Sequence, residues 1–339
     1  MAQAIIMAGG QGERFWPMTH GKFPKYRIRF NGKESLLQKT YKRLLCVYSA
    51  NSIYVVTTQP HFKLIREELP KLPIRNILIE PFRNNTAAAI FLSCELMRKK
   101  FGDNEILSFF PADQLIQNEN EFKKTMTSVM RLADKKESLV TVGIRPGFAS
   151  TGYGYIEKGK AVSGYSGAYL VKRFVEKPNV KKALNYIKSR NFLWNAGIFT
   201  WKTNVFLKTM RRFSPDFSKN FNLKDLSKSY KKLPNRSIDY ALMEKADNVT
   251  IFETRMDWCD MGNWDMYHEK SPASNDGIIS SGKVYRAEAV NSLLLNYTEQ
   301  PLVALGVRDL IVVNTPLGTL VCKKGMAEAA SLFFKKMNS

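Results

Sequence analysis

Three glycines directly follow the first apolar run of the chain, residues 4–8: Gly9, Gly10 and Gly12. Glycine lets the backbone adopt unusual φ angles and lets its N–H groups approach a phosphate closely. Arg14 and Lys25 come next, with Pro17 between them and Pro24 directly before Lys25. Since proline restricts the backbone, the segment predicts a stiffened loop that lays two cations on a polyphosphate. An ordinary glycine-rich turn with surface cations would explain the glycines alone equally well.

This loop differs from two familiar phosphate-binding motifs. Phe15 occupies the position of the last glycine of G-x-G-x-x-G, and the segment continues to Trp16 and Pro17. The P-loop pattern G-x-x-x-x-G-K-[ST] does not match it either. The loop is therefore expected to bind phosphates through a longer segment than these motifs use.

Two aspartates are candidates for holding a metal ion beside such phosphates. Asp113 closely follows the apolar segment 105–110, and Asp260 lies within the aromatic-rich segment 257–264. Mg²⁺ is usually held by one or two carboxylates together with substrate phosphates. A helix cap and a turn residue are the structural alternatives for Asp113 and Asp260.

Further polar residues stand among apolar neighbours later in the chain. Asn85 and Thr86 lie at the expected start of a helix, directly before an alanine run. Glu176 and Lys177 are an adjacent acid and cation, and Asn195 lies in an apolar segment. The structural alternatives are a surface ion pair for Glu176 and Lys177 and a satisfied core amide for Asn195.

The first half of the chain alternates between expected strands and expected helices. Short apolar runs predict strands, and apolar residues at helical spacing predict helices. The expected strands are residues 4–8, 53–58, 76–80, 105–110 and 139–144, and the expected helices are 36–50, 61–69, 86–101 and 118–136. Strands separated by such helices predict a Rossmann-like α/β fold, with a mixed, mostly parallel sheet flanked by helices. Ligands bind beyond the carboxyl ends of strands in such a sheet.

The pattern changes after residue 151, where glycine-rich and β-rich segments predict an antiparallel extension of the sheet. Short β-rich pieces follow a turn signal at residues 275–277, and a helix is expected at 327–337. We therefore expect a catalytic domain over residues 1–269 and a small β-rich domain over residues 270–339. Two arrangements of the small domain stay open, a coiled β-solenoid such as a left-handed β-helix and a compact sheet.

The composition argues against several classes of protein. The chain has 339 residues, of which 44% are hydrophobic, so a buried core is expected rather than disorder. The four cysteines form no C-x-x-C pair and only three histidines occur, so neither a disulfide framework nor a histidine metal centre is indicated. No apolar stretch approaches the ~20 residues that cross a bilayer. We expect a cytoplasmic protein with no membrane partner.

The net charge of +22 has three interpretations. Nucleic-acid binding, steering of anionic substrates and a lysine-rich surface without a specific role would each produce it. The cations occur as dispersed pairs, and the sequence has no basic run of five or more residues and no nucleic-acid motif. We therefore expect no nucleic-acid partner.

Taken in order, the motifs resemble those of one enzyme family. The series GGQGERFWP…PK, EPFRNNTA, FPADQ, YGYI, FVEKP, WNAGIF and DWCDMGNW is similar to that of the sugar-nucleotide pyrophosphorylases, a family of nucleotidyltransferases. The resemblance covers nearly the whole chain, and EPFRNNTA and WNAGIF point to the branch that makes GDP-mannose. Three segments depart from the family, because PKYRIRF replaces PKQFL, PADQ replaces PADH and RNNTA replaces GRNTA. The base and sugar preferences therefore stay open.

The resemblance implies a role for each candidate residue. It implies a catalytic set (Arg14, Lys25, Asp113 and Asp260), a nucleotide site (Gly9, Gly10, Gly12, Asn85 and Thr86), a sugar-phosphate site (Gly154, Glu176, Lys177 and Asn195) and a Mg²⁺ site (Asp113 and Asp260). Arg14 and Lys25 would hold the triphosphate, and Asn85 and Thr86 would lie at the edge of the guanine. A homodimer is compatible with the resemblance.

The implied reaction transfers a guanylyl group from GTP to α-D-mannose 1-phosphate and gives GDP-mannose and pyrophosphate. The sugar phosphate would attack the α-phosphate in line, with Mg²⁺ as cofactor. Because its second pKa lies near 6, the sugar phosphate is mostly a dianion at pH 7 and needs no general base. The alternatives are a pyrophosphorylase for another sugar 1-phosphate or nucleotide and, outside the enzymes, an inactive sugar-nucleotide sensor. The retained catalytic set argues against the sensor.

Overall fold

The computed structural model of the chain describes residues 2–10, 12–19, 23–30, 34–219 and 221–337. The chain divides into two compact units that are interleaved in the sequence. Unit 1 comprises Met1–Gly9, Thr40–Ala112 and Ile116–Trp258, and unit 2 comprises Gly10–Lys39, Asp113–Leu115 and Cys259–Ser339. Most of the glycine loop therefore belongs to the same unit as the C-terminal strands. The domains expected over residues 1–269 and 270–339 stay a prediction.

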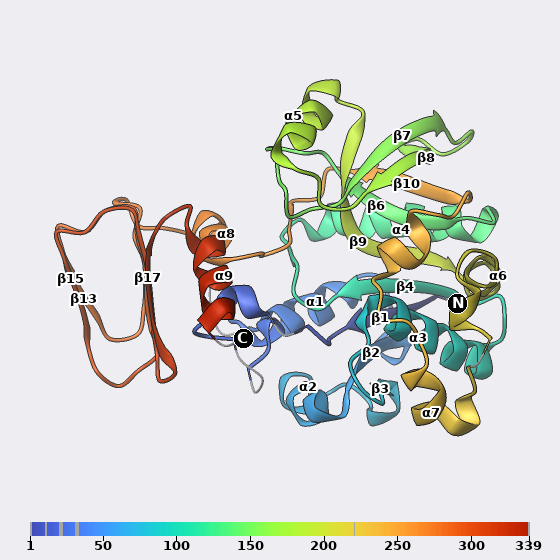
Figure 1. The fold of residues 1–339 in the computed structure, drawn as a ribbon, viewed down its shortest axis with the longest axis horizontal. Helices are drawn as coiled ribbons and strands as arrows, with labels where there is room; N and C mark the ends of the chain where they lie inside the picture. Colours follow the sequence, from blue (N-terminus) through green and yellow to red (C-terminus); the bar gives the residue numbers. More distant parts are fainter. Residues whose placement is uncertain (1, 11, 20–22, 31–33, 220, 338–339) are drawn as a thin grey trace. The chain divides into compact units, whose positions relative to one another are not determined.

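A nine-stranded sheet forms the centre of unit 1 (Figure 1). Its strands are β1 (Ala2–Met7), β2 (Ile53–Thr58), β3 (Ile77–Glu80), β4 (Ile106–Pro111), β6 (Leu139–Ile144), β7 (Tyr155–Ala161), β8 (Ala168–Val175), β9 (Phe192–Lys202) and β10 (Val249–Thr254). The strand order is β3-β2-β1-β4-β9-β6-β10-β8-β7. Strands β3, β2, β1 and β4 are parallel neighbours, and β6 is parallel to β10. Strand β9 is antiparallel to β4 and β6, and β8 is antiparallel to β7 and β10.

The expected mixed α/β sheet is confirmed, but it is not mostly parallel, because beyond β4 only the pairing of β6 with β10 is parallel. The expectation of a mostly parallel sheet came from the alternating first half of the chain. The hairpin between β7 and β8 and the return of the chain along β9 reverse the strand direction in the other half. A hairpin needs only a short turn, whereas a parallel connection needs a crossover of a dozen or more residues.

Helices cover both faces of this sheet. They are α1 (Leu36–Leu44), α2 (Phe62–Glu68), α3 (Asn85–Phe101), α4 (Glu119–Lys135), α5 (Val180–Ser189), α6 (Thr203–Phe213) and α7 (Leu226–Lys231). Phe109 and Phe110 are neighbours on β4 and so point to opposite faces. Phe109 belongs to the apolar core that contains residues of α3 and α6, whereas the ring of Phe110 lies 6.0 Å from that of Phe122 on α4. Within the described ranges, no helix is long and apolar enough to cross a membrane.

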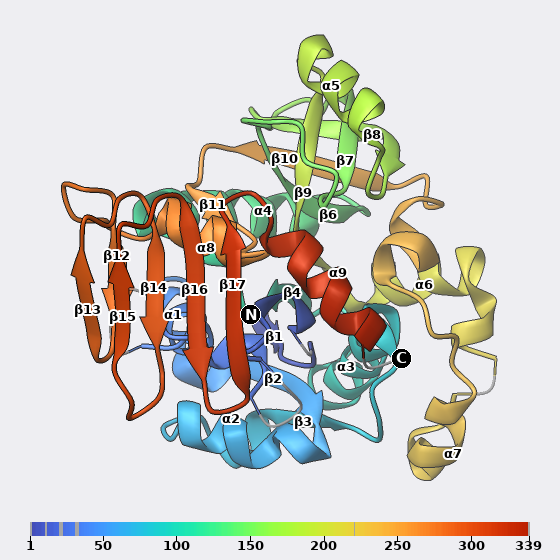
Figure 2. The same ribbon diagram turned by 60° about the vertical axis from the view of Figure 1, so that its left-hand side comes forward.

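Stacked parallel strands form the C-terminal part of unit 2 (Figure 2). They are β12 (Ile279–Ser281), β13 (Val284–Ala287), β14 (Leu293–Asn296), β15 (Leu302–Leu305) and β16 (Leu310–Thr315); the antiparallel β17 (Gly318–Lys323) follows, and α8 (Trp264–Lys270) and α9 (Ala327–Met337) flank the strands. Strands β12, β14 and β16 pair in one sheet, and β13 and β15 pair in another. Leu293 lies opposite Ile311, and Asn314 donates a hydrogen bond to Asn296, 18 residues earlier. Paired residues are 18 positions apart between β13 and β15 and between β14 and β16, and 14 positions apart between β12 and β14. Two short strands, β5 (Leu115–Ile116) and β11 (Trp258–Cys259), pair separately.

One apolar core joins the glycine loop to the C-terminal strands within unit 2. The ring of Phe15 meets that of Trp264 edge-on, with centroids 4.8 Å apart, and the indole N–H of Trp264 donates to the carbonyl oxygen of Trp16. The buried members of this core are Phe15, Ile28, Phe30, Leu36, Leu115, Cys259, Met261, Trp264, Tyr267, Leu293, Leu295, Ile311, Val313, Leu320 and Ala327. The loop that carries Arg14 and Lys25 is thus held in place by residues from the end of the chain.

We expect Ile311→Ala to destabilise the protein by about 2–5 kcal/mol, because Ile311 is fully buried and the substitution leaves a cavity in this core. The glycine loop should also become more sensitive to trypsin at Lys25 and Arg27. Limited proteolysis and urea unfolding measure the two effects. Val303→Ala on β15 is the control, because Val303 is 58% exposed and should change neither result. An unchanged cleavage rate in a clearly destabilised Ile311→Ala protein would contradict the dependence of the loop on this core.

Candidate functional site

The glycine loop brings its backbone close to Lys25. Gly12 has a φ of +69°, which disfavours any residue with a side chain, and a Cβ at this position would collide with Cβ of Lys25. The carbonyl oxygen of Gly12 accepts hydrogen bonds from the hydroxyl of Thr19 at 2.5 Å and from the N–H of Phe15 at 2.9 Å. Glycine is therefore required at position 12 by its φ and by its contact with Lys25.

Lys25 is the buried centre of a cluster within unit 2. Its side chain is only 8% exposed, and its Nζ lies 2.8 Å from Oδ2 of Asp113. The same Nζ donates a hydrogen bond of 2.7 Å to the backbone carbonyl oxygen of Asp260. A buried charge needs such partners, because removing it from water without them is costly. The structure therefore brings Lys25 together with both expected metal-binding aspartates.

Arg14 completes this cluster from the more exposed side. Nη2 of Arg14 lies 3.9 Å from Oδ2 of Asp260, and the Arg14 side chain is 41% exposed. Gly262 lies beside the pair, where a Cβ would be 3.5 Å from Nη1 of Arg14. A long and partly exposed ion pair of this kind contributes little to stability. Arg14 is therefore accessible to an anion from solution.

The carboxylates of this cluster fit a hard divalent cation only in part. The side chains of Asp113 and Asp260 are partly exposed, at 29% and 26%. No group of three or more histidine, cysteine or acidic side chains with metal-binding geometry occurs among the residues that the structure describes. Mg²⁺ binds through one or two carboxylates when waters and substrate phosphates supply the remaining oxygens. The donor set therefore suits a metal that arrives with phosphates.

The residues expected around the nucleotide base lie at the carboxyl end of β3 in unit 1. Asn85 has a φ of +63° and its Oδ1 accepts from the N–H of Thr86. The hydroxyl of Thr86 accepts from the N–H of Ile238 at 2.9 Å. Asn85 and Thr86 thus both make hydrogen bonds that shape the start of α3. Gly9 and Gly10 follow β1, which runs beside β2 in the same sheet.

Glu80 is an acid at this position that the sequence patterns missed. It ends β3 in a buried position, and its Oε2 accepts a hydrogen bond from the hydroxyl of Tyr230. Its Oε1 lies 3.7 Å from where a Cβ of Gly9 would be. Burial raises the pKa of Glu80 to about 7, although Tyr230 and Arg83 oppose the rise. Glu80 opens the segment EPFRNNTA, so its place after an apolar strand was the available signal.

The four residues expected around the sugar phosphate come together in unit 1. A Cβ on Gly154 would lie 2.6 Å from Oε2 of Glu176 and 3.5 Å from Cβ of Asn195. The N–H of Asn195 donates to the carbonyl oxygen of Gly154 at 2.9 Å, and Nζ of Lys177 donates to Oε1 of Glu176. Burial acts to lower the pKa of Lys177, but the hydrogen bond and charge of Glu176 outweigh it and raise the pKa. Gly154 permits this close approach of Glu176.

Asp239 is a second acid that the sequence patterns missed. It begins a short π-helix, Asp239–Met243. Its Oδ1 accepts a hydrogen bond of 3.0 Å from Nδ2 of Asn195. Burial, and then the nearby charge of Glu176, raise the pKa of Asp239 to about 7. No motif marked it, because its proximity to Asn195 depends on tertiary packing.

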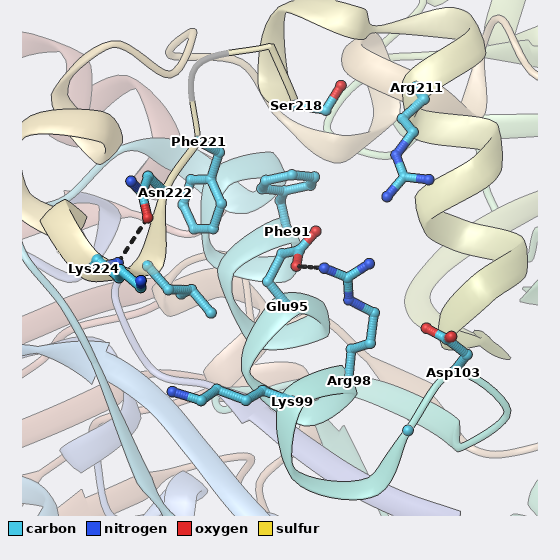
Figure 3. Close-up of a pocket in the computed structure, with 12 residues that line it drawn as sticks. Phe91, Glu95, Arg98, Lys99, Asp103, Arg211, Ser218, Phe221, Asn222 and Lys224 are labelled. Carbon is cyan, nitrogen blue, oxygen red and sulfur yellow. Dashed lines mark hydrogen bonds and ion pairs between the residues drawn. The ribbon is translucent and has the colours of Figure 1, made fainter.

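A separate cavity of about 660 Å³ lies in unit 1, beside the C-terminal half of α3 (Figure 3). Phe91 and Phe221 line it, with their rings edge-on at 5.0 Å. The guanidinium of Arg98 pairs with Glu95 at 2.7 Å beside them, as Figure 3 shows. None of the expected site residues lines this cavity, so it is distinct from the groups described above.

The fold and these clusters define a class of protein. A glycine loop beyond the first strand of an α/β sheet, with a buried lysine between two aspartates, is typical of an enzyme that binds and polarises phosphates. The chain belongs to the nucleotidyl transferase family, whose model matches residues 3–277. Enzymes of this family generally use a divalent metal.

Comparison with individual proteins shows which members of this enzyme class the chain is similar to. The mannose-1-phosphate guanylyltransferase 2 of Escherichia coli O157:H7 is 33% identical over 342 residues, which cover 95% of this chain and 70% of the relative. A crystal structure described as a mannose-1-phosphate geranyltransferase of Thermus thermophilus has a TM-score of 0.87 and 27% identity, covering 100% of this chain and 99% of that one. A Helicobacter pylori structure described as a mannose-6-phosphate isomerase has a TM-score of 0.62 and 26% identity, covering 76% of this chain and 99% of that one. The family expected from the motifs is confirmed.

We expect Glu80→Gln to stabilise the protein at pH 8 by up to about 3 kcal/mol. The raised pKa means that folded Glu80 binds its proton more tightly than the unfolded chain does. Its ionisation therefore destabilises the fold progressively as the pH rises from about 4 to about 7, and fully above that. Glutamine cannot ionise and still accepts the hydrogen bond of Tyr230, so most of the gain should disappear at pH 5.

Urea unfolding at pH 5 and pH 8 measures this difference. Glu137→Gln is the matched control, because the Glu137 side chain is 85% exposed and its stability effect should be small at both values. If Glu80→Gln is less stable than the wild type at pH 8, the raised pKa is wrong.

Proposed function

We propose that this protein is a mannose-1-phosphate guanylyltransferase, which converts GTP and α-D-mannose 1-phosphate to GDP-mannose and pyrophosphate. The observation that carries the proposal is the buried Lys25, bound to Asp113 and to the backbone of Asp260. This cluster occurs in a chain whose relatives over most of its length bear that name. A phosphate-binding cluster explains why a lysine is buried with two acids, which a purely structural role does not require.

In the proposed reaction, an oxygen of the sugar phosphate forms a bond to the α-phosphorus of GTP. The bond from the α-phosphorus to the bridging oxygen breaks, and the electron pair leaves with pyrophosphate. Because the attacking phosphate is already a dianion at pH 7, the protein has no proton to remove. Its task is to hold two anions in line and to offset the charge that develops. We assign this task to Lys25 and Arg14, with the backbone of Gly9, Gly10 and Gly12 against the phosphates.

We propose Mg²⁺ as the divalent metal, held by Asp113 and Asp260. Both side chains are partly exposed, and Lys25 contacts the carboxylate of Asp113 and the backbone carbonyl oxygen of Asp260, which supports this assignment. When bound, the ion would neutralise negative charge on the phosphates. Lys25 would keep Asp113 oriented, because its Nζ already contacts one oxygen of that carboxylate.

Two clusters in unit 1 are the proposed subsites for the two substrates. Guanine presents two adjacent N–H donors, and the carboxylate of Glu80 offers an acceptor oxygen toward Gly9. We therefore assign Glu80 to the base, beside Asn85 and Thr86. The sugar phosphate is assigned to the cluster of residues that combines a cation, a carboxylate and an amide: Gly154, Glu176, Lys177 and Asn195.

Three further properties are part of the proposal. The 18-residue offsets of β15 from β13 and of β16 from β14 support a short left-handed β-helix in the C-terminal part of unit 2. We also propose a homodimer, which rests on the resemblance alone, and a cytoplasmic location, which rests on the composition of the chain.

The first test is a panel of nucleoside triphosphates and sugar 1-phosphates with pyrophosphate release as the readout. We expect GTP with mannose 1-phosphate to give the highest kcat/KM. ITP, which lacks the 2-amino group of guanine, should be used less well, because it offers only one of the two donors to Glu80. A clearly higher kcat/KM with another pair would replace the proposed substrates.

The second test concerns the cluster at Lys25. Lys25→Met and Asp113→Asn should each lower kcat by at least ~100-fold, the usual effect of removing one group that stabilises developing charge. EDTA should abolish turnover, and added Mg²⁺ should restore it. Lys231→Ala is the control, since Lys231 is exposed in a segment without an assigned role. Full activity in EDTA would exclude the metal, and full activity of Lys25→Met would exclude the assigned catalytic role.

A further inference from the structure

The amide of Asn195 has one orientation that satisfies its surroundings in unit 1. Its Oδ1 accepts hydrogen bonds from the hydroxyl of Thr141 and from the N–H of Gly197, each at 3.1 Å. Its Nδ2 donates to Oδ1 of Asp239 at 3.0 Å. A side-chain amide has two N–H donors, so one donor of Asn195 is left without an acceptor in the described part of the chain.

The carboxylate oxygen of Asp239 determines which way the amide of Asn195 points, because it accepts a hydrogen bond from Nδ2 and cannot accept one from Oδ1. If the amide of Asn195 turned over, its oxygen would face the oxygen of Asp239, and its NH₂ would face the N–H of Gly197. The hydroxyl of Thr141 could accept from the turned NH₂, because it can donate to the carbonyl oxygen of Ile198 instead. The hydrogen bonds to Gly197 and Asp239 would be lost, and a carboxylate would lie against a carbonyl oxygen. Asp239 therefore holds Asn195 with its remaining N–H available to an oxygen of a ligand.

The surroundings of Asp239 make its ionised form energetically unfavourable. Glu176, in the turn after β8, places a second negative charge nearby, and Lys177 in the same turn offsets it. On its own segment, Ser237 donates a hydrogen bond toward Asp239. Glu244 and Tyr240 on the same segment are further titratable groups that interact with Glu176 and with Lys177, respectively. The raised pKa of Asp239 means that its ionisation is opposed by burial and by Glu176, and such perturbed acids often occur at functional sites.

We propose that Asp239 is a positioning residue of the sugar-phosphate subsite, which acts by orienting the amide of Asn195 toward the substrate. This inference rests on the proposed function. Asp239 itself need not touch the substrate. Its carboxylate ensures that the subsite presents an N–H donor from Asn195, together with the ammonium of Lys177 and the carboxylate of Glu176. Such a set suits a ligand that carries a phosphate and several hydroxyl groups.

A double-mutant cycle with Asn195→Ala and Asp239→Ala tests this role. We expect each single substitution to raise KM for mannose 1-phosphate at least tenfold, with KM for GTP changed less than twofold. Because Asp239 acts through Asn195, the double variant should bind the sugar phosphate no more weakly than Asn195→Ala alone. Calorimetric Kd values for mannose 1-phosphate give the same comparison without turnover.

Asp239→Asn and a surface variant complete the design. Asp239→Asn keeps an acceptor oxygen, so it should recover part of the affinity lost in Asp239→Ala. It removes the ionisation that burial opposes, so its Tm at pH 8 should equal or exceed that of the wild type. Asp247→Ala is the control, because Asp247 pairs with Arg212 on the surface and should leave both KM values unchanged.

The outcomes separate this inference from the proposed function. Absence of wild-type turnover with GTP and mannose 1-phosphate would overturn the proposed function. Wild-type turnover with unchanged sugar-phosphate KM and Kd in Asp239→Ala would overturn only the role of Asp239. Additive effects of the two alanine substitutions would show that Asp239 does not act through Asn195. A lowered Tm of Asp239→Asn at pH 8 with unchanged affinity would make Asp239 a structural residue.

Discussion

The burial of one ammonium group sets the arrangement of unit 2. Lys25 cannot lie in an apolar surrounding unless anionic or carbonyl oxygens face it. Those oxygens come from Asp113 and Asp260, which are distant from Lys25 and from each other along the chain. Three separate segments must therefore fold together before the charge is satisfied. This requirement accounts for a unit that is assembled from interleaved pieces of sequence.

The parts of the fold that depend on local pattern were predictable. Strands β2 and β6 occur at the expected residues, and α3 begins one residue before the expected start, because each has a strong apolar pattern of its own. Strand β10 was not expected, since its segment Val249–Thr254 carries no marked alternation and is defined by its parallel pairing with β6. Helix α1 was expected to reach residue 50 but ends at Leu44. Its last turns continue as irregular backbone that the apolar spacing does not distinguish from a helix.

The polar site residues likewise divide into those that a local motif reveals and those that only tertiary contacts reveal. Lys25, Asp113 and Asp260 were identified by motif, and the structure places them in contact. Glu80 and Asp239 were missed, because what marks them is burial beside Tyr230 and beside Glu176. Burial and charge proximity between residues far apart in sequence appear only in three dimensions. The roles assigned to these residues remain proposals that rest on their geometry.

The apolar core shared by the glycine loop and the C-terminal strands has a consequence for the order in which the protein is made. On the ribosome the loop emerges long before its packing partners between Leu293 and Ala327. Domains usually fold as units once their residues are available, so unit 2 cannot be completed before these residues emerge, whereas the strands of the unit 1 sheet all precede them. A chain that stops before Leu293 would lack the groups that hold Arg14 and Lys25 in place. Its cations would then reach a phosphate without a fixed arrangement.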